Sequence, residues 1–153
     1  MALVYLGLGS NLGQKEHNLE VAISEIKKQI GSIVARSVFY ESAPWGFESS
    51  NSFINACVSV ETALSPPECL RTILKIEKRL GRSKKPSESY MDRTIDIDIL
   101  FYDQILFREE NLIIPHPLLH QRLFVLNPLS EIAPDFIHPL FKKTVKSLLK
   151  EIS

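Results

Sequence analysis

The chain has 153 residues, of which 44% are hydrophobic and 24% charged, and its 18 basic and 18 acidic residues cancel. These values are typical of a globular protein, and we expect a single domain over residues 1–153. Zero net charge argues against a protein that coats nucleic acid or an anionic membrane, because neither would attract it over a long range. No apolar run is long enough to span a bilayer. We therefore expect no nucleic-acid and no membrane partner.

The N-terminus and the two cysteines favour a cytoplasmic location. The first residues are apolar but carry no basic stretch, and they meet glycines early, so they indicate a first strand and not a signal peptide. Cys57 and Cys69 lie in apolar segments without a CxxC motif. We interpret them as reduced thiols of the core, a state that fits the cytosol.

The first half of the chain predicts alternating strands and helices. Residues 2–8 form a strand candidate that runs into a turn cluster, and residues 16–30 carry apolar positions at helical spacing. Residues 33–40 predict a second strand and residues 41–51 a loop rich in Ser, Pro and Gly. Residues 53–62 alternate as a strand does, with Phe53 and Asn55 on one face and Ile54 and Val58 on the other.

The second half begins with a clear helix start. Ser65 can act as the N-cap, Pro66 takes the first helical position and Glu68 the third, which completes a capping box. The helix ends at Gly81 and a cationic loop follows over residues 82–93. The remaining elements are a strand over 94–102, a short return over 104–107 and a short helix near 143–152. This order predicts an α+β fold, a ferredoxin-like α/β sandwich with a mainly antiparallel sheet and helices packed on it.

The most informative segment is the strand that contains two aspartates. Ile95, Ile97 and Ile99 would enter the core, while Asp96 and Asp98 would share the opposite face about 6.5–7 Å apart. Two ionised carboxylates at this spacing repel each other and need a compensating cation. Oxygen ligands favour Mg²⁺, which accepts substrate phosphates as further ligands. The alternative is an ordinary half-exposed strand, although Asp is depleted in strands.

The loop before this strand is a candidate phosphate clamp. It carries four cationic side chains, Arg82, Lys84, Lys85 and Arg93. Movable cationic donors can stabilise the charge of a transferring phosphoryl group. The alternative for such a run is a solvated surface loop.

Other motifs carry weaker signals. The glycines of residues 7–13 match neither GxGxxG nor a P-loop, and we interpret them as a tight strand-to-helix turn. His116 and His120 have a zinc-like spacing, but prolines flank the first, and phosphate contact near Arg122 suits it better.

Aromatic residues suggest a site for a planar ligand. Phe53 and Asn55 point the same way from one strand, and Phe124 follows the His116–Arg122 segment. A planar heterocycle could stack on such rings and hydrogen-bond to the amide. The alternative is two core phenylalanines and an ordinary polar residue.

Seven motifs in order resemble the 6-hydroxymethyl-7,8-dihydropterin pyrophosphokinases of folate biosynthesis. They cover nearly the whole chain: LGLGSN at 6–11, SVFYESAPWG at 37–46, FINACVSVET at 53–62, IEKRLGR at 76–82, DRTIDIDIL at 92–100, IPHPLLHQRLF at 114–124 and LSEIAPD at 129–135. The resemblance implies transfer of pyrophosphate from ATP to the hydroxymethyl group of the pterin, which gives the pterin diphosphate and AMP.

The resemblance also implies roles for residues. Asp96 and Asp98 would hold two Mg²⁺ ions with ATP, and Arg82 and Arg93 would act in catalysis. The ATP side would comprise Glu77, Lys84, Tyr90, Ile99, His116 and Arg122. The pterin side would comprise Ser42, Ala43, Pro44, Trp45, Phe53, Asn55 and Phe124. ATP and the pterin would be the only partners of a monomer.

The chain departs from the family pattern in two places. Met91 and Asp92 stand before the motif arginine where small residues are expected, and Tyr90 stands where a Trp would stack. Asn111 and Ile113 replace residues that are often polar or basic on the nucleotide side. These changes bear on ATP affinity and rate more than on the type of reaction.

Two other classes of protein remain open at this point. A DxD-dependent nucleotidyl or glycosyl transferase would use the carboxylates and the cationic loop but not Phe53, Asn55 and Phe124. A binding module, or a pterin-binding relative without turnover, would bind its ligand without a metal-dependent affinity for ATP.

Overall fold

The chain alternates strands and helices around one antiparallel sheet before it ends in a helical part. This computed structural model describes residues 1–44, 51–81 and 94–153. The elements in chain order are β1 (Ala2–Ser10), α1 (Lys15–Gln29), β2 (Gly31–Arg36), β3 (Tyr40–Ser42), β4 (Phe53–Thr62), α2 (Pro66–Arg79), β5 (Asp96–Tyr102), β6 (Phe107–Glu109), β7 (Leu112–Ile114), the 3₁₀ turn η1 (Leu119–Gln121), α3 (Leu123–Ile132) and α4 (Val145–Ile152).

The main sheet has the ferredoxin-like strand order that the sequence predicts. Its strands lie in the order β2-β4-β1-β5, with β3 paired to the far end of β4. Every one of these pairings is antiparallel. Strands β6 and β7 form a separate hairpin. β1 and β4 therefore occupy the centre of the sheet, and β5, which carries the two aspartates, lies at its edge.

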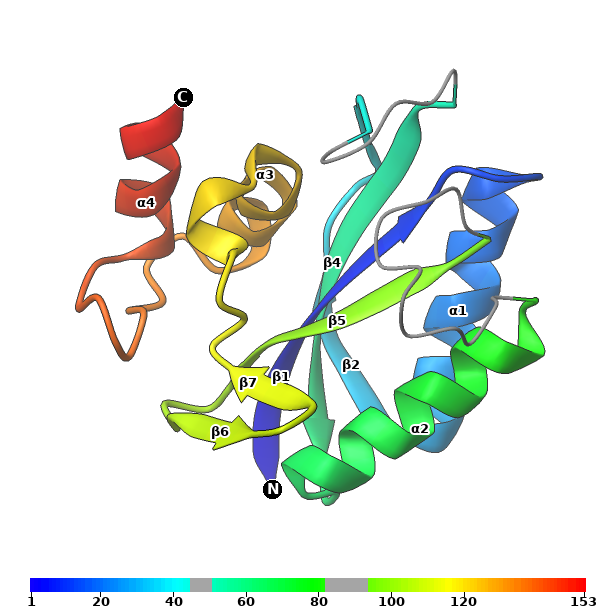
Figure 1. Ribbon diagram of the computed structural model, residues 1–153, viewed down its shortest axis with the longest axis horizontal. Coiled ribbons are helices and arrows are strands. Elements are labelled where there is room, and N and C mark those ends of the chain that lie inside the picture. The colour runs from blue at the N-terminus through cyan, green and yellow to red at the C-terminus, as the bar shows by residue number, and fades with distance from the viewer. Residues whose placement is uncertain (45–50, 82–93) are drawn as a thin grey trace.

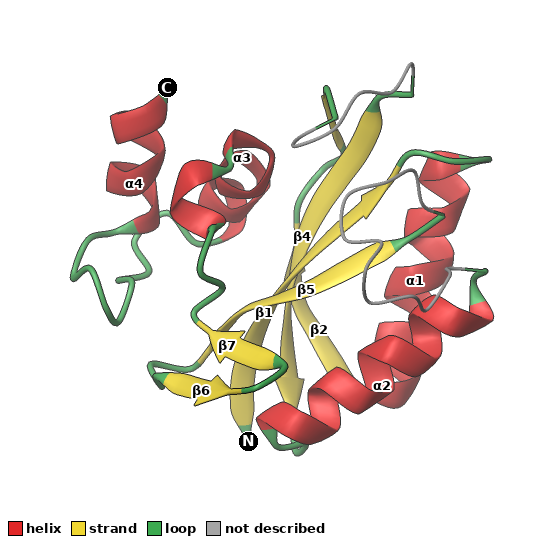
Figure 2. Cartoon of the chain, in the orientation of Figure 1, coloured by secondary structure: helices red, strands yellow, loops and turns green. Residues whose placement is uncertain are grey.

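Helices cover the two faces of the sheet unequally (Figures 1 and 2). α1 and α2 lie along one face and bury a core that we call the α1/α2 core, which includes Leu6, Leu8, Ile97 and Ile99. α3 and α4 pack at one end of the other face, over a smaller C-terminal core. We call the rest of this second face, which no helix of the described residues covers, the open face.

A bulge in β5 changes the face to which its residues point. The pairing of β1 with β5 shifts register between Tyr5 and Leu6, which lie opposite Phe101 and Ile99. Leu100 is the extra residue, and both Leu100 and Phe101 enter the C-terminal core. β5 therefore places its acidic half on the open face and its apolar half under α3 and α4.

The start of α2 confirms the predicted capping box. The Ser65 hydroxyl accepts a hydrogen bond from the Glu68 N–H at 3.3 Å, and the Glu68 carboxylate accepts one from the Ser65 N–H at 2.8 Å. The two bonds satisfy backbone donors that the first helical turn would otherwise leave without a partner. They fix where α2 begins, and α2 in turn positions Glu77 against β5.

Two predictions for the first half of the chain were wrong in their bounds. β1 runs to Ser10, so Gly7 and Gly9 lie within the strand and not in a turn. The single strand predicted over 33–40 is two strands, because the regular pairing with β4 is interrupted at Ser37. There the Ser37 N–H still donates to the Cys57 carbonyl at 2.9 Å, but it is the Ser37 hydroxyl that accepts from the Cys57 N–H, at 3.0 Å. β3 then begins at Tyr40, the last residue of the predicted strand, and continues into the predicted loop.

The second half contains elements that the prediction lacked. The short return predicted at 104–107 is replaced by the β6–β7 hairpin, and β5 begins at Asp96, not at residue 94. α3 was missed because Pro128 lies inside it, where proline removes a hydrogen-bond donor and usually ends a helix. Among the described residues, no helix is both long and apolar enough to cross a bilayer.

Candidate functional site

On the open face, two glycines of β1 lie between the aspartates of β5 and the residues of β4. Gly9 pairs with Asp96 of β5 on one side and with Asn55 of β4 on the other. Directly paired residues point to the same face of a sheet, so Asp96, Asn55 and the missing side chain of Gly9 share one face. The isoleucines that alternate with the aspartates are buried, as predicted, and Asp96 and Asp98 are half-buried. A floor without side chains thus separates the carboxylates from the polar end of β4.

Gly9 is the position where a side chain would fill this space. A Cβ atom there would lie 3.1 Å from Asn55 Oδ1 and 3.4 Å from Phe53 Cδ1. At Gly7, by contrast, a Cβ atom would meet only the side chain of Leu100 at 3.4–3.7 Å, which is ordinary contact. The close approach at Gly9 therefore explains why this position has no side chain.

The carboxamide of Asn55 is held in one orientation. Its Nδ2 donates to the backbone carbonyl of Tyr40 at 3.3 Å and to the hydroxyl oxygen of Ser42 at 2.7 Å. Because a carbonyl can only accept, the nitrogen must face Tyr40 and the oxygen must face Gly9. Asn55 is 3% exposed. It therefore presents a fixed acceptor to a ligand that lies over Gly9.

The other residues expected on the pterin side surround this end of β4. Phe53 pairs with Ser42 of β3, and Ala43 and Pro44 follow β3 directly. Phe124 lies in the first turn of α3 and packs against the C-terminal core. Trp45 lies outside the described residues. Apart from Trp45, the residues expected to bind the pterin lie on β3 or directly after it, on β4, and on the helix that packs over these strands.

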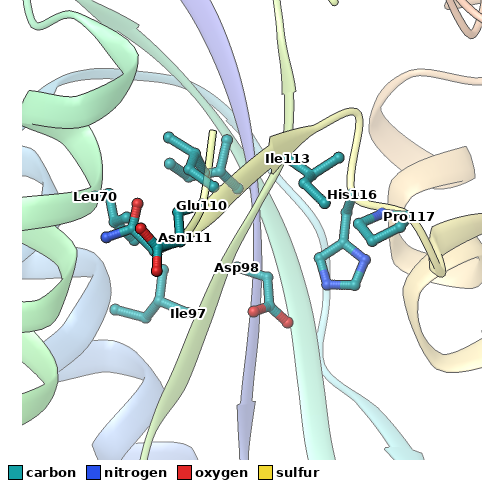
Figure 3. Close-up of a pocket in the computed structure, with 10 residues that line it drawn as sticks. Leu70, Ile97, Asp98, Glu110, Asn111, Ile113, His116 and Pro117 are labelled. Atoms are coloured by element: carbon teal, nitrogen blue, oxygen red, sulfur yellow. The ribbon is translucent and has the colours of Figure 1, made fainter. Parts of the chain in front are cut away.

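A pocket of about 300 Å³ lies along the outer edge of β5. Its walls come from β5, from Leu70 of α2 and from the β6–β7 hairpin and the segment after it, and they comprise Leu70, Ile97, Asp98, Ile99, Glu110, Asn111, Leu112, Ile113, His116 and Pro117. Figure 3 shows Asp98 and His116 toward one end of this pocket, with Leu70, Glu110 and Asn111 toward the other. The pocket thus has one end that combines apolar and polar side chains and another end that has a carboxylate and an imidazole.

His116 is neutral and its tautomer is fixed. Burial, with a smaller effect of the nearby Arg122 charge, lowers the pKa of His116 from 6.5 to about 4. The Leu118 N–H donates to His116 Nδ1 at 3.1 Å, so Nδ1 carries no proton. The proton must be on Nε2. His116 is therefore a neutral hydrogen-bond donor, which suits an anionic ligand without adding charge.

We expect His116 to remain neutral until the pH falls close to 4. In the unfolded chain its pKa returns to about 6.5, so the unfolded state binds more protons below that pH. Between pH 6.5 and 4 the free energy of unfolding should therefore fall with falling pH, by up to about 1.4 kcal/mol per pH unit for this residue. NMR titration of the imidazole and urea unfolding at several pH values measure both quantities. Burial also lowers the pKa of His138 to about 4, so His138 should add a second decrease of the unfolding free energy in the same pH window.

The matched variants His116→Gln and His138→Gln separate the two contributions. Each should reduce the slope of unfolding free energy against pH in this window. A His116 resonance that titrates near pH 6.5 in the folded protein would contradict the assignment.

Glu77 supports β5 from the side of the helices. It is 3% exposed, and its Oε2 accepts a hydrogen bond from the Ile97 N–H at 2.8 Å. Ile97 lies between Asp96 and Asp98, so this carboxylate fixes the backbone of the acidic segment. The family resemblance predicts Glu77 near the nucleotide. In the structure its carboxylate binds the backbone of β5, the strand that forms a wall of the pocket.

Arg122 and Ile99 are both largely buried. Arg122 is the N-cap residue of α3 and is 7% exposed, with its guanidinium carbon 5.5 Å from the centre of the Phe124 ring. Its charge helps to lower the pKa of His116.

Ile99 is 5% exposed, and although it contributes to the pocket wall, its side chain belongs to the α1/α2 core.

Five of the expected site residues lie outside the described ranges, namely Trp45, Arg82, Lys84, Tyr90 and Arg93. Lys85 of the predicted clamp and the departure at Met91 and Asp92 lie outside them too. Within residues 1–44, 51–81 and 94–153, no group of three or more His, Cys, Asp or Glu side chains could hold a metal by itself. In these ranges His116 and His120 therefore have no third ligand of these types for a zinc ion. A metal at Asp96 and Asp98 would need oxygen ligands from a substrate or from water.

Sequence reasoning missed two contributors to the site. Leu70 carries no signal of its own in the sequence, because its position in the pocket beside β5 depends on how α2 packs. Gly9 was assigned to a turn. The spacing of Gly7 and Gly9 by two residues inside an apolar strand was the available signal, because glycine within a strand often marks close approach of a ligand or backbone.

Comparisons with known proteins agree with this arrangement. Residues 5–134 match the family model described as 7,8-dihydro-6-hydroxymethylpterin-pyrophosphokinase (HPPK). The chain is similar to the 2-amino-4-hydroxy-6-hydroxymethyldihydropteridine pyrophosphokinase of Porphyromonas gingivalis, with 43% identity over 141 residues that cover 91% of this chain and 95% of the relative. It is also 41% identical to the enzyme of the same name from Aquifex aeolicus, over 99% of this chain and 92% of the relative.

A solved structure shows the same fold. The wild-type HPPK-DHPS of Plasmodium falciparum aligns with a TM-score of 0.78 at 18% identity over 98% of this chain. The chain spans only 44% of the length of that larger protein. The family match extends from β1 into the turn after α3 and includes the open face of the sheet and the edge pocket. The chain belongs to the 7,8-dihydro-6-hydroxymethylpterin-pyrophosphokinase family.

Proposed function

We propose that this chain transfers pyrophosphate from ATP to the hydroxymethyl oxygen of 6-hydroxymethyl-7,8-dihydropterin, releasing the pterin diphosphate and AMP in folate biosynthesis. The observation that carries the proposal is the shared face of Asp96, Gly9 and Asn55 in a chain of this family. This face offers a polar and aromatic end for a heterocycle and an acidic end for a metal-bound polyphosphate. Gly9 lies between the two ends and contributes no side chain there.

The pterin binds at the β4 end in this proposal. Phe53 and Phe124 stack against its two faces, while Asn55 Oδ1 accepts a hydrogen bond from its edge. Ser42, Ala43, Pro44 and Trp45 complete the wall. The fixed acceptor of Asn55 supports this assignment, because an amino or ring N–H group on the ligand edge matches it.

Asp96 and Asp98 fit a pair of Mg²⁺ ions that ATP brings with its phosphates. Two carboxylates from one strand supply hard oxygen ligands, and their partners in β1, Gly7 and Gly9, add no side chain beside them. Asp96 and Asp98 would hold the Mg²⁺, which would supply positive charge to offset that of the phosphate oxygens.

ATP occupies the edge pocket in this proposal. The base lies toward Leu70 and Ile99, and the phosphates extend toward Asp98 and His116. His116 donates from Nε2 to a phosphate oxygen. Arg122 adds positive charge, and Glu77 holds the β5 backbone in place. From the segment outside the described residues, Arg82, Lys84 and Arg93 contact the phosphates and Tyr90 stacks at the nucleotide side.

The chemistry then depends on alignment and charge and needs no nucleophile from the protein. Asp96 and Asn55 lie two strand spacings apart, about 10 Å, which allows a pterin over β4 to direct its hydroxymethyl group at phosphates held by β5. The substrate hydroxyl attacks the β-phosphorus and AMP leaves. Positioning of this kind can supply a large part of a catalytic effect.

Product analysis tests the proposal directly. The protein is incubated with ATP, Mg²⁺ and the hydroxymethyl pterin, and the nucleotide products are separated. Pterin-dependent AMP is the expected result. Pterin-dependent ADP would mean attack at the γ-phosphorus, and binding of pterin without consumption of ATP would contradict turnover by this chain.

The remaining expectations about the whole protein stay predictions. These are a single domain over residues 1–153, a monomeric state, a cytoplasmic location, and ATP and the pterin as the only partners. Gel filtration tests the monomeric state, and titration with ATP with and without Mg²⁺ tests the expected dependence on the metal.

A further inference from the structure

The last turn of α3 is tied to the connection between β2 and β3. Glu131 accepts a hydrogen bond from the Tyr40 phenol at 2.7 Å, through Oε1. Both of its oxygens lie 3.2 Å from the Val38 backbone nitrogen, which donates to them. One carboxylate therefore holds the start of β3 at two points, and its bond from Tyr40 raises the pKa of that phenol to about 12.

Tyr40 links this carboxylate to the ligand-facing amide. It pairs with Asn55 in the sheet, and its backbone carbonyl accepts from Asn55 Nδ2. The third residue of β3, Ser42, accepts the second bond of the same amide. The position of β3 thus decides where Asn55 Oδ1 points.

α3 also carries the aromatic residue expected on the other side of the pterin. Phe124 lies in its first turn and Glu131 in its last, seven residues apart. Residues at this spacing lie on the same side of a helix, and α3 packs against both β3 and β4. The same helix therefore holds one wall of the site with Phe124 and fixes the opposing strand with Glu131.

We propose that Glu131 is a positioning residue for the pterin, which sets the spacing between Phe124 on α3 and the β3–β4 wall through its bonds to Tyr40 and Val38. This inference rests on the proposed function, because it assigns the pterin to the space between these walls. Glu131 does not touch the ligand. It acts through Tyr40 on the orientation of Asn55 and through α3 on the distance to Phe124.

The alternative is a surface contact without consequence for binding. Glu131 is exposed, and the net contribution of a hydrogen bond to stability is modest, about 1 kcal/mol. For that reason unfolding should hardly change when its charge is removed, whereas the geometry of the pterin site should. A positioning role therefore predicts a change in pterin affinity with little change in stability, whereas a surface contact predicts a change in neither.

The test uses Glu131→Gln, Tyr40→Phe and the double variant. Each single change should raise the KM for the pterin about tenfold and leave the KM for ATP within twofold. The double variant should resemble the singles, because residues that act as one unit are not additive. Direct titration of the pterin, followed by its fluorescence in the absence of ATP, should show the same loss of affinity.

Glu20→Gln is the matched control. Glu20 is an exposed carboxylate that binds Arg36 at 3.0 Å and so also holds β2, but from α1. This variant should leave both KM values unchanged. Equal effects of Glu20→Gln and Glu131→Gln, a parallel rise in both KM values, or an unchanged pterin affinity would each overturn the proposal.

Failure of the proposed function looks different from failure of this inference. If the wild-type protein neither binds the pterin nor forms AMP, the assignment of the site itself is wrong. If the wild type binds and reacts, and Glu131→Gln binds the pterin equally well, only the positioning role is wrong.

Discussion

Replacing Asp98 by Ala is expected to reduce AMP formation at least about 10³-fold, which corresponds to about 4 kcal/mol of transition-state stabilisation. Asp98 lies both on the open face beside Gly7 and on the wall of the edge pocket, so it can reach a metal-bound phosphate from β5. Asp98→Asn keeps the shape of the side chain and removes its charge. It should lose nearly as much activity, because a neutral amide cannot offset a divalent cation.

The same variants separate a loss of chemistry from a loss of fold. Asp98 is half-buried and belongs to neither core, so urea unfolding should change little. Asp135→Ala is a matched control, because Asp135 is an exposed carboxylate in an ion pair with Lys146 at 3.1 Å, away from the open face. Activity of Asp98→Ala or Asp98→Asn close to that of the wild type would remove the metal assignment.

Gly9→Ala is expected to weaken pterin binding by about tenfold, and Gly9→Val by more. The added Cβ would lie 3.1 Å from Asn55 Oδ1, and Asn55 cannot readily move because Tyr40 and Ser42 hold its nitrogen. Either the acceptor turns away from the ligand or the methyl group occupies the ligand's place. Titration of the pterin and its KM both measure this effect.

Gly7→Ala provides the comparison within the same strand. Its Cβ would meet the Leu100 side chain at ordinary contact distance, so we expect pterin affinity within about twofold of wild type. Equal losses at both glycines would mean that β1 tolerates no side chain there for reasons of folding. Unaltered affinity in Gly9→Val would show that the ligand does not lie over this strand.

The sequence predicts well where a local pattern has a single physical meaning. Asp96 and Asp98 alternate with three isoleucines, and a half-buried strand can bury only the isoleucines. The structure has this arrangement. Ser65 and Glu68 together specify one helix start. The ferredoxin-like order follows from the sequence of such elements.

The sequence fails where the meaning of a residue depends on tertiary contacts. Pro128 usually ends a helix, yet α3 continues through it because its apolar side packs on β4. Gly9 has the same local appearance as a turn glycine, and only the paired strands reveal that Asn55 and Phe53 approach it. The neutral state of His116 likewise depends on burial that no local pattern encodes.

The position of the pocket on an edge strand has a consequence for the solution behaviour of the protein. An edge strand presents backbone groups to which a strand of another molecule can add, and β5, whose second half is apolar, is such a strand. Two of its outward groups are occupied from within the chain. Glu77 accepts from the Ile97 N–H, and the His116 N–H donates to the Leu100 carbonyl at 3.0 Å. The bonds that shape the pocket wall thus also protect β5 against intermolecular strand addition and aggregation.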